Sequence, residues 1–376
     1  MTKTMNKTVP EVKGQIFFIQ ALRAIAAGIV LLWHFKPTVT DEFELSLLNL
    51  FFANGFAGVD IFFVISGFIM VYSTDSLQGG KLSAVVFLAK RFTPIWPLYA
   101  FGTILYVLFL LTLDWLTIEE LKRAALSLLF YPVLPHPTLD VGWTLNLEIF
   151  FYLLFSLCLL TNRFRWTIIF FYIVIFFLIK SNTIDYLEIA SKAPVFSLYI
   201  QQAPHPCVLE FFLGAIIGKL FLLNISIPKH LGLSLTAILV SFSIWQYLSG
   251  FAGRPGIFGF GLGAIALVLG LAIAEKSGAG WKPNSILMWL GNISFSIYIT
   301  HTVIGLSITR VLNNYGMSSY TNNIGYIIFL IFIILVFSFL TYELIEKRLS
   351  AKLSNILTNT IISRSSKKAS SPKHCV

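Results

Sequence analysis

Long apolar runs alternate with short polar segments along nearly the whole chain, and this pattern predicts a bundle of membrane-spanning helices. A helix that crosses a bilayer needs about 20 consecutive apolar residues. We predict about ten such spans, at residues 16–35, 54–73, 92–112, 143–160, 166–181, 207–223, 231–249, 257–274, 286–309 and 324–343. A shorter apolar stretch, Ala124 to Leu134, ends among prolines and is expected to lie at the membrane interface or to re-enter the membrane.

Composition agrees with this pattern and predicts an all-α integral membrane protein. The chain is 57% hydrophobic and only 12% charged, about half the charged fraction of a soluble domain. We therefore expect a cytoplasmic N-terminal segment at residues 1–14, one membrane domain at 15–346, and a basic, Ser-rich cytoplasmic tail at 347–376 that is poorly ordered.

The basic residues are unevenly distributed between the two sides of the predicted bundle. If the N-terminus is cytoplasmic, most of the 27 Lys and Arg fall in cytoplasmic segments, which is the positive-inside pattern of membrane proteins. Both termini are therefore expected in the cytoplasm, and the first span would act as an uncleaved anchor in the inner, cytoplasmic membrane. The net charge of +10 is explained by this topology and by contact with membrane lipid, so nucleic acid is not an expected partner.

Arg23 and His34 lie in the first span, eleven residues apart. Eleven residues are close to three helical turns, so both side chains share one helix face, about 16 Å apart along the axis. Ionisable side chains inside a membrane are costly and commonly mark a pathway or a reactive site. This pair is therefore the first candidate for function.

Three other spans carry ionisable residues at a similar predicted depth, near the outer side. Asp60 lies close to the outer end of the second span, Glu148 lies in the fourth, and Tyr298 and His301 lie in the ninth. A carboxylate that bonds one nitrogen of a histidine ring fixes its tautomer and stabilises the imidazolium. We expect Asp60 or Glu148 to orient His34 in this way, although either carboxylate could instead accept hydrogen bonds from a neighbouring helix.

A basic cluster at the start of the third span predicts a phosphate site on the cytoplasmic side. Lys90 and Arg91 stand there in the run KRFTPIWPLY, and such donors suit an anionic cofactor in a partly dry pocket. Basic residues also flank many cytoplasmic span ends. The alternative is therefore that Lys90 and Arg91 only mark the cytoplasmic end of this span. Ser66 and Gly67, in the middle of span two, permit close backbone approach.

Cysteine spacing indicates neither a metal site nor a disulfide framework, because Cys158, Cys207 and Cys375 form no recognisable motif. We therefore predict no metal. The chain also lacks a Walker motif and a GxGxxG sequence, which makes a nucleotide-driven pump an unfavoured reading.

Five motifs in order make the chain resemble the acyltransferase-3 family of membrane acyltransferases, over about residues 14–348. They are Arg23-x10-His34, GVDIFFVISGFIM at 58–70, KRFTPIWPLY at 90–99, WTLNLEIFFYLLF at 143–155, and GNISFSIYITH at 291–301. The pattern is most similar to the exopolysaccharide and O-antigen acetyltransferases. One departure concerns the cofactor site, since the family's second arginine of an RxxR pair is replaced here by Pro94.

The resemblance implies transfer of an acyl group, most often acetyl from acetyl-CoA, to a hydroxyl of a cell-surface or lipid-linked saccharide. It implies acyl-CoA binding on the cytoplasmic side and a saccharide acceptor on the outer side. The residues that would bind the donor are Arg23, Ser66, Lys90 and Arg91. The catalytic residues would be His34, Glu148 and Asp60. The residues that would bind the acceptor are Trp143, Asn146, Tyr298 and His301.

Histidine can act as a general base or as a covalent acyl carrier, so direct transfer with His34 as the base is preferred and an acyl-histidine intermediate remains open. The competing class is a transporter, for example a flippase of lipid-linked saccharides, because intramembrane charges also mark substrate paths. Against it, the chain shows no repeated halves.

Overall fold

Helices form all of the regular structure in the described part of this computed structural model, and no strand occurs there. The described residues are 16–35, 52–77, 79–161, 164–182, 184–193, 196–317 and 324–370. The prediction of an all-α chain is confirmed for these ranges. The expected N-terminal segment, 1–14, lies outside them.

A helix coincides with each predicted span. The first eight spans correspond to α1 (Phe17–His34), α4 (Ala57–Thr74), α5 (Lys81–Thr112), α7 (Gly142–Leu160), α8 (Arg165–Lys180), α11 (Cys207–Leu222), α12 (Lys229–Ser249) and α13 (Gly261–Lys276). The ninth corresponds to four consecutive pieces, α14 (Ser285–Asn292), α15 (Ser294–Thr300), the π-helix η3 (His301–Leu306) and α16 (Ser307–Asn314). The tenth is α18 (Ile324–Thr341), and α6 (Ile118–Leu128), α9 (Tyr186–Lys192) and α10 (Ser197–Gln202) are short connecting helices.

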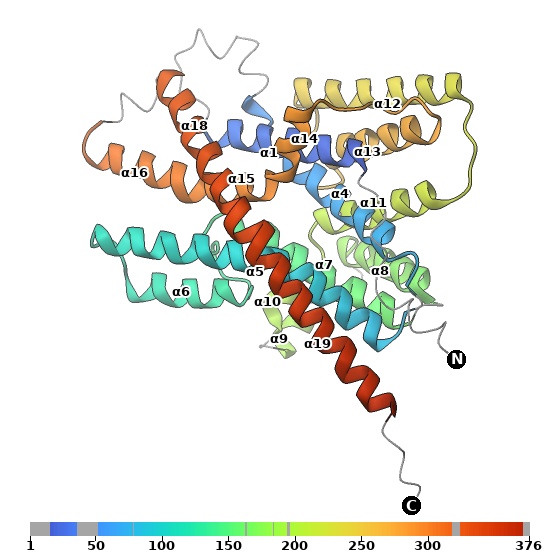
Figure 1. Cartoon of the computed structure of the whole chain (residues 1–376), viewed down its shortest axis with the longest axis horizontal. Coiled ribbons are helices and arrows are strands. Elements are labelled where there is room, and N and C mark those ends of the chain that lie inside the picture. The colour runs from blue at the N-terminus through green and yellow to red at the C-terminus, as the bar shows by residue number, and fades with distance from the viewer. Residues whose placement is uncertain are drawn as a thin grey trace, which may run out of the picture.

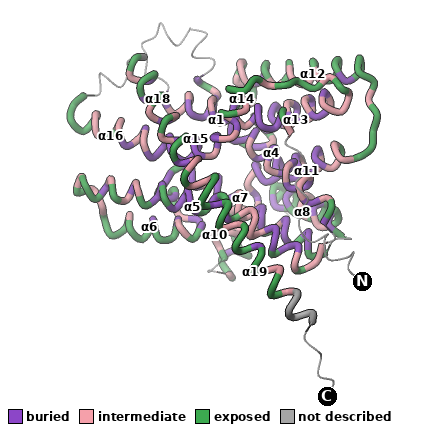
Figure 2. Tube along the Cα trace, in the orientation of Figure 1, coloured by how far each residue is buried: buried purple, intermediate pink, exposed green. Residues whose placement is uncertain are grey.

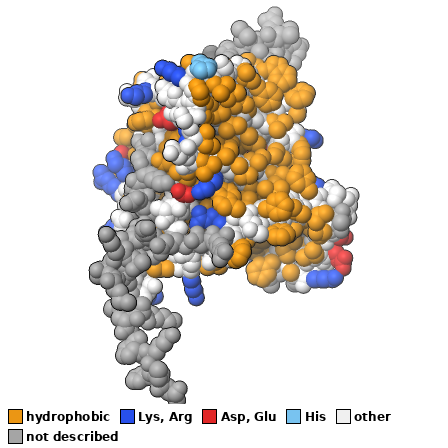
Figure 3. Space-filling model, turned by 90° about the vertical axis from the view of Figure 1, so that its right-hand side faces the viewer, with side chains coloured by type: hydrophobic (Ala, Val, Ile, Leu, Met, Phe, Trp, Pro, Cys, Tyr) orange, Lys and Arg blue, Asp and Glu red, His pale blue; other side chains and the backbone are white. Residues whose placement is uncertain are grey.

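Seven helical segments of the described chain are long and apolar enough to cross a membrane. Helices α8, α11 and α13 have 16 residues each, or about 24 Å of helix, which is shorter than a hydrocarbon core of about 30 Å. One face of the molecule is a broad hydrophobic area with Lys and Arg mostly along its borders (Figure 3). The chain is thus a multi-pass membrane protein, while the number of spans stays a prediction.

Helix α4 occupies the centre of the bundle, between α1, α11 and α13 (Figure 1). Buried residues concentrate in α4 and α11, whereas α6, α12 and α19 are more exposed (Figure 2). Glycines bring α4 and α11 together, because a Cβ atom on Gly67 would lie 1.9 Å from the Phe211 carbonyl oxygen and one on Gly214 would lie 2.0 Å from that of Val64. Small residues that let backbones approach are a common basis of helix packing in membranes.

The C-terminal tail differs from its prediction. After α18 the chain continues through the π-helix η4 (Tyr342–Ser350) into α19 (Ala351–Ser370), so the expected poorly ordered tail is helical up to Ser370. Packing against α5 accounts for the difference, since both η4 and α19 contact that helix. Composition alone does not reveal such a tertiary contact.

The close approach of α4 and α11 generates a stability prediction. Gly214→Ala places a methyl group against the backbone of Val64, so we expect a loss of about 1–3 kcal/mol, typical of overpacking. The matched control is Gly28→Ala, because a Cβ atom there meets nothing within 4 Å. Thermal unfolding of both variants in one detergent is the measurement, and equal midpoints would contradict this packing.

Candidate active site

A cavity of about 300 Å³ lies among α1, α4, α5, α7 and α15. The predicted site residues that line it are Arg23, Ser66, Lys90, Arg91, Glu148 and Tyr298. All four residues assigned to the donor are in this group, although they come from three different helices. The structure therefore brings the predicted donor set together around one space.

Helix α5 contributes the basic end of the cavity. It begins at Lys81, well before the predicted start of the third span, and continues through Pro94 and Pro97. Proline lacks the N–H that normally bonds the carbonyl four residues earlier, so the carbonyl of Lys90 loses its usual helical donor from position 94. Arg91 donates to the Ser73 hydroxyl at 2.6 Å.

Carboxylates form part of the same cavity wall. Glu148 Oε1 accepts hydrogen bonds from Ser66 at 2.8 Å and from Tyr152 at 2.6 Å. Glu346, on η4, accepts one from Ser296 at 2.9 Å. The lining thus carries three basic side chains against two acidic ones, a net positive charge that favours an anionic ligand.

Tyr298 and Thr144 stand together at the wall of the cavity. Their hydroxyl groups are 2.8 Å apart, and the Tyr298 ring packs edge-on against Phe62, with ring centroids 5.8 Å apart. The Tyr298 ring also lies 5.9 Å from the ring of His301, which is outside the lining. This tyrosine therefore separates the cavity from the histidine beyond it.

His34 and His301 form a pair next to Tyr298. His301 Nε2 lies 3.3 Å from His34 Nδ1, and the ring centroids are 4.7 Å apart. His34 is the last residue of α1, and His301 begins η3, a π-helical turn, a feature frequent at functional sites. The two spans thus place their histidines in direct contact.

The hydrogen-bond partners of this pair assign its tautomers. His34 Nδ1 lies 2.9 Å from the Val30 carbonyl, and His301 Nδ1 lies 3.0 Å from the Ile297 carbonyl. Carbonyl oxygens only accept, so each Nδ1 carries a proton. His301 Nε2 in its neutral form is then a second acceptor for the His34 Nδ1–H group, which it shares with the nearer Val30 carbonyl. His34 Nε2 keeps its lone pair and has no hydrogen-bond partner among the described residues.

This geometry does not support the predicted orienting role of Asp60 or Glu148. Asp60 accepts from the Gly256 N–H group at 2.7 Å and lies with Cys207 and Glu210, outside the cavity. Glu148 bonds Ser66 and Tyr152 instead of an imidazole. A neutral ring, His301, occupies the place beside His34 that we had given to a carboxylate.

A row of half-buried aromatic rings begins beside His34. Trp33 lies 4.7 Å from the His34 ring and 5.6 Å from Phe56, which stacks on Trp143 at 5.9 Å. Trp143 is thus linked to the histidine pair through Trp33 and Phe56, and it does not line the cavity. Asn146 is 2% exposed, and its side-chain oxygen has no partner in the described part of the chain, so the structure does not place it on an open surface.

Two acidic residues were missed by the sequence reasoning. Glu210 lies inside the apolar run CVLEFFLGAIIG, and the criterion that selected Asp60, an ionisable side chain within a span, would have found it. Glu346 precedes Lys347 and Arg348, so it reads as part of a charged cytoplasmic flank. Only the fold shows that it lines the cavity.

Together, the apolar helices, the basic cavity and the adjacent histidine pair define a multi-pass membrane protein with a site suited to group transfer. Comparison with known proteins gives the family: the sequence profile of an acyltransferase domain matches residues 16–343. The chain therefore belongs to this acyltransferase family, as its motifs predicted.

A curated relative is the exopolysaccharide production protein ExoZ of Rhizobium meliloti (strain 1021). The two sequences are 32% identical over 266 residues, which cover 67% of this chain and 77% of that protein. No solved structure matches the fold.

Proposed function

We propose that this acyltransferase moves an acyl group, acetyl in the simplest case, from acyl-CoA in the cytoplasm to a hydroxyl of a saccharide at the outer face of the inner membrane. The observation that carries the proposal is the histidine pair beside a cavity lined with basic residues. The family match favours chemistry over the transporter alternative. The name of the relative, exopolysaccharide production protein, supports a polysaccharide or its lipid-linked precursor as the acceptor.

The size of the cavity decides how the donor binds. Pockets for drug-sized ligands measure about 300–1,000 Å³, and this one has about 300 Å³. CoA is larger than such ligands, so the pantetheine arm would occupy the cavity while the nucleotide stays at its mouth. Lys90 and Arg91 would hold phosphate groups there, because charge-assisted bonds to phosphate are strong.

The acyl end of the donor would then pass Arg23 and reach Tyr298. Tyr298, bonded to Thr144, lies between the cavity and His301, so in this proposal the two side chains separate during turnover. Glu148 would accept a hydrogen bond from an amide of the arm through Oε2, since the bonds from Ser66 and Tyr152 both go to Oε1. This role replaces the one assigned to Glu148 from the sequence.

In the proposed reaction His34 Nε2 takes the proton of the acceptor hydroxyl, and the oxygen attacks the thioester carbonyl. The tetrahedral intermediate collapses, the C–S bond breaks, and the leaving thiolate receives the proton from the His34 imidazolium. His301 stabilises this imidazolium through the bond to Nδ1. An acyl-histidine intermediate would use the same Nε2 lone pair as a nucleophile.

The acceptor would approach from the side where Trp33, Phe56 and Trp143 lie. Pockets are commonly lined by aromatic side chains with a few polar groups that fix orientation. Trp33 lies next to the His34 ring, and Phe56 and Trp143 follow beyond it. A saccharide bound there would present a hydroxyl to Nε2. Donor and acceptor then reach the histidine from opposite ends of the bundle.

The first prediction from this proposal concerns His34. Because it supplies the base, His34→Ala should lower transfer by about 10²- to 10⁴-fold, the usual contribution of general base catalysis, at equal protein in the membrane. The matched control is His230→Ala, which changes an exposed histidine on α12. O-acyl groups on the saccharide product are measured, and near wild-type levels with His34→Ala would remove this residue from the mechanism.

The second prediction concerns donor binding, where Pro94 departs from the family pattern. Arg91→Ala should weaken CoA binding by about 10- to 150-fold, since a bond to a charged group is worth about 1.5–3 kcal/mol. Lys90→Ala alone should weaken CoA binding less than Arg91→Ala does. In the double variant the two losses of affinity should add. Affinity for CoA is measured with purified protein in nanodiscs.

Lys81→Ala is the control for this experiment, because Lys81 lies on the same helix outside the cavity. Its affinity for CoA should match the wild type. An unchanged affinity in the Lys90/Arg91 double variant would show that the phosphates bind elsewhere.

A further inference from the structure

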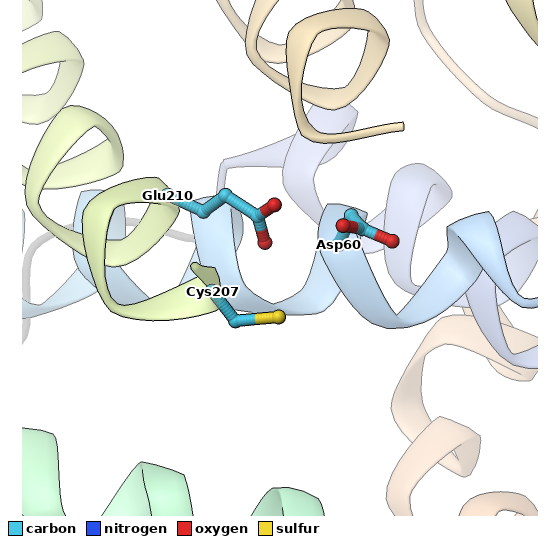
Figure 4. A group of neighbouring side chains, drawn as sticks. All are labelled: Asp60, Cys207 and Glu210. Atoms are coloured by element: carbon cyan, nitrogen blue, oxygen red, sulfur yellow. The ribbon is translucent and has the colours of Figure 1, made fainter. Parts of the chain in front are cut away.

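A second polar cluster lies inside the bundle, separate from the cavity. Asp60 of α4 and Glu210 of α11 are both fully buried, at 0% exposure, and Cys207 at the start of α11 is buried beside them. One ligand atom from each side chain lies within 4.8 Å of the other two. Figure 4 shows the Glu210 carboxylate pointing toward Asp60, with the Cys207 sulfur on the same side.

Hydrogen bonds leave most of this cluster unsatisfied. Asp60 Oδ1 accepts from Gly256 N–H, but Asp60 Oδ2 and both oxygens of Glu210 have no partner among the described residues. Buried polar atoms are normally paired, and an unpaired buried carboxylate is very unfavourable. Three unpaired oxygens in one place therefore call for a proton or a cation between the two carboxyl groups.

A shared proton is the competing way to satisfy the cluster. One proton between Asp60 and Glu210 pairs a single oxygen from each, and the Cys207 S–H group is a further donor beside them. A divalent cation contacts several oxygens at once, and its two positive charges balance two carboxylates. The sulfur of Cys207 favours zinc over magnesium or calcium, which prefer oxygen ligands alone.

The geometry points to a zinc-class divalent cation site formed by Asp60, Cys207 and Glu210. Cys207 and Glu210 are three residues apart on one helix, so they share a face, and Asp60 completes the set from the adjacent helix. Zinc binds four ligands in structural sites, which leaves one position for a water molecule or a backbone oxygen. Bound metal would tie α4, α11 and the Gly256 segment together.

This site also explains why the cysteine spacing showed no metal motif. Only one cysteine takes part, and Asp60 lies far from Cys207 along the chain. The prediction that no metal binds rested on linear spacing, whereas the site requires the packing of α4 on α11. The inference is independent of the proposed reaction, because no residue of the cavity or of the histidine pair belongs to it.

The test is metal analysis of the purified full-length protein in nanodiscs. After loading with Zn²⁺ and removal of free metal, the wild type should keep about one zinc per chain. Glu210→Gln should weaken Zn²⁺ binding by at least about 10- to 100-fold, the loss that even outer-shell changes cause. Cys158→Ser, at the other buried free cysteine, is the matched control and should keep the metal.

Cobalt substitution covers the possibility that Glu210→Gln fails to fold. Co²⁺ bound to the wild type should show a sulfur-to-cobalt charge-transfer band, and the small change Cys207→Ser should abolish it while Cys158→Ser leaves it intact. Wild-type protein that holds neither zinc nor cobalt above the level of the variants would overturn the proposal. The two carboxyl groups would then share a proton.

Discussion

The contact between His34 and His301 is the interaction on which the rest of this account depends. Both Nδ1 atoms face backbone carbonyls, and this fixes the proton on the same nitrogen of each ring. The lone pair of His301 Nε2 then faces His34 Nδ1 at 3.3 Å. As a result, His34 presents its unprotonated Nε2 to a substrate, which is the state that a general base requires.

The surrounding helices serve to make this contact possible in an apolar environment. Polar groups in a membrane need partners within the protein, and the two acidic side chains of the cavity have them: Glu148 has Ser66 and Tyr152, and Glu346 has Ser296. The close packing of α4 on α11 through Gly67 and Gly214 holds the wall that carries Ser66. Stability and chemistry thus depend on the same helices.

The helices and much of the site could be predicted from the sequence. Apolar runs located the helices, and the cost of ionisable groups in a membrane selected His34, Arg23 and His301. Contacts between helices could not be predicted in this way, because depth along a span does not give rotation about its axis. Asp60 therefore points to Glu210 instead of His34, and the helical tail after Ser350 follows from packing against α5.

The family motifs indicate the reaction, whereas the packing of the helices shows which site residues are neighbours. Motifs indicated the reaction and its donor, and the profile match established the family. They did not show that His301 lies beside His34, or that Tyr298 stands between the cavity and that pair. Those relations come from how α1, α7, α15 and η3 pack.

The most direct test of the central claim is ¹⁵N NMR of the histidine rings in the lipid-embedded protein. His34 and His301 signals are assigned by their loss in His34→Gln and His301→Gln variants. At a pH where both rings are neutral, we predict a protonated Nδ1 and an unprotonated Nε2 on each. A proton on Nε2 of either ring would contradict the account. On His34 it would occupy the atom proposed as the general base, and on His301 it would remove the acceptor of the His34 Nδ1–H group.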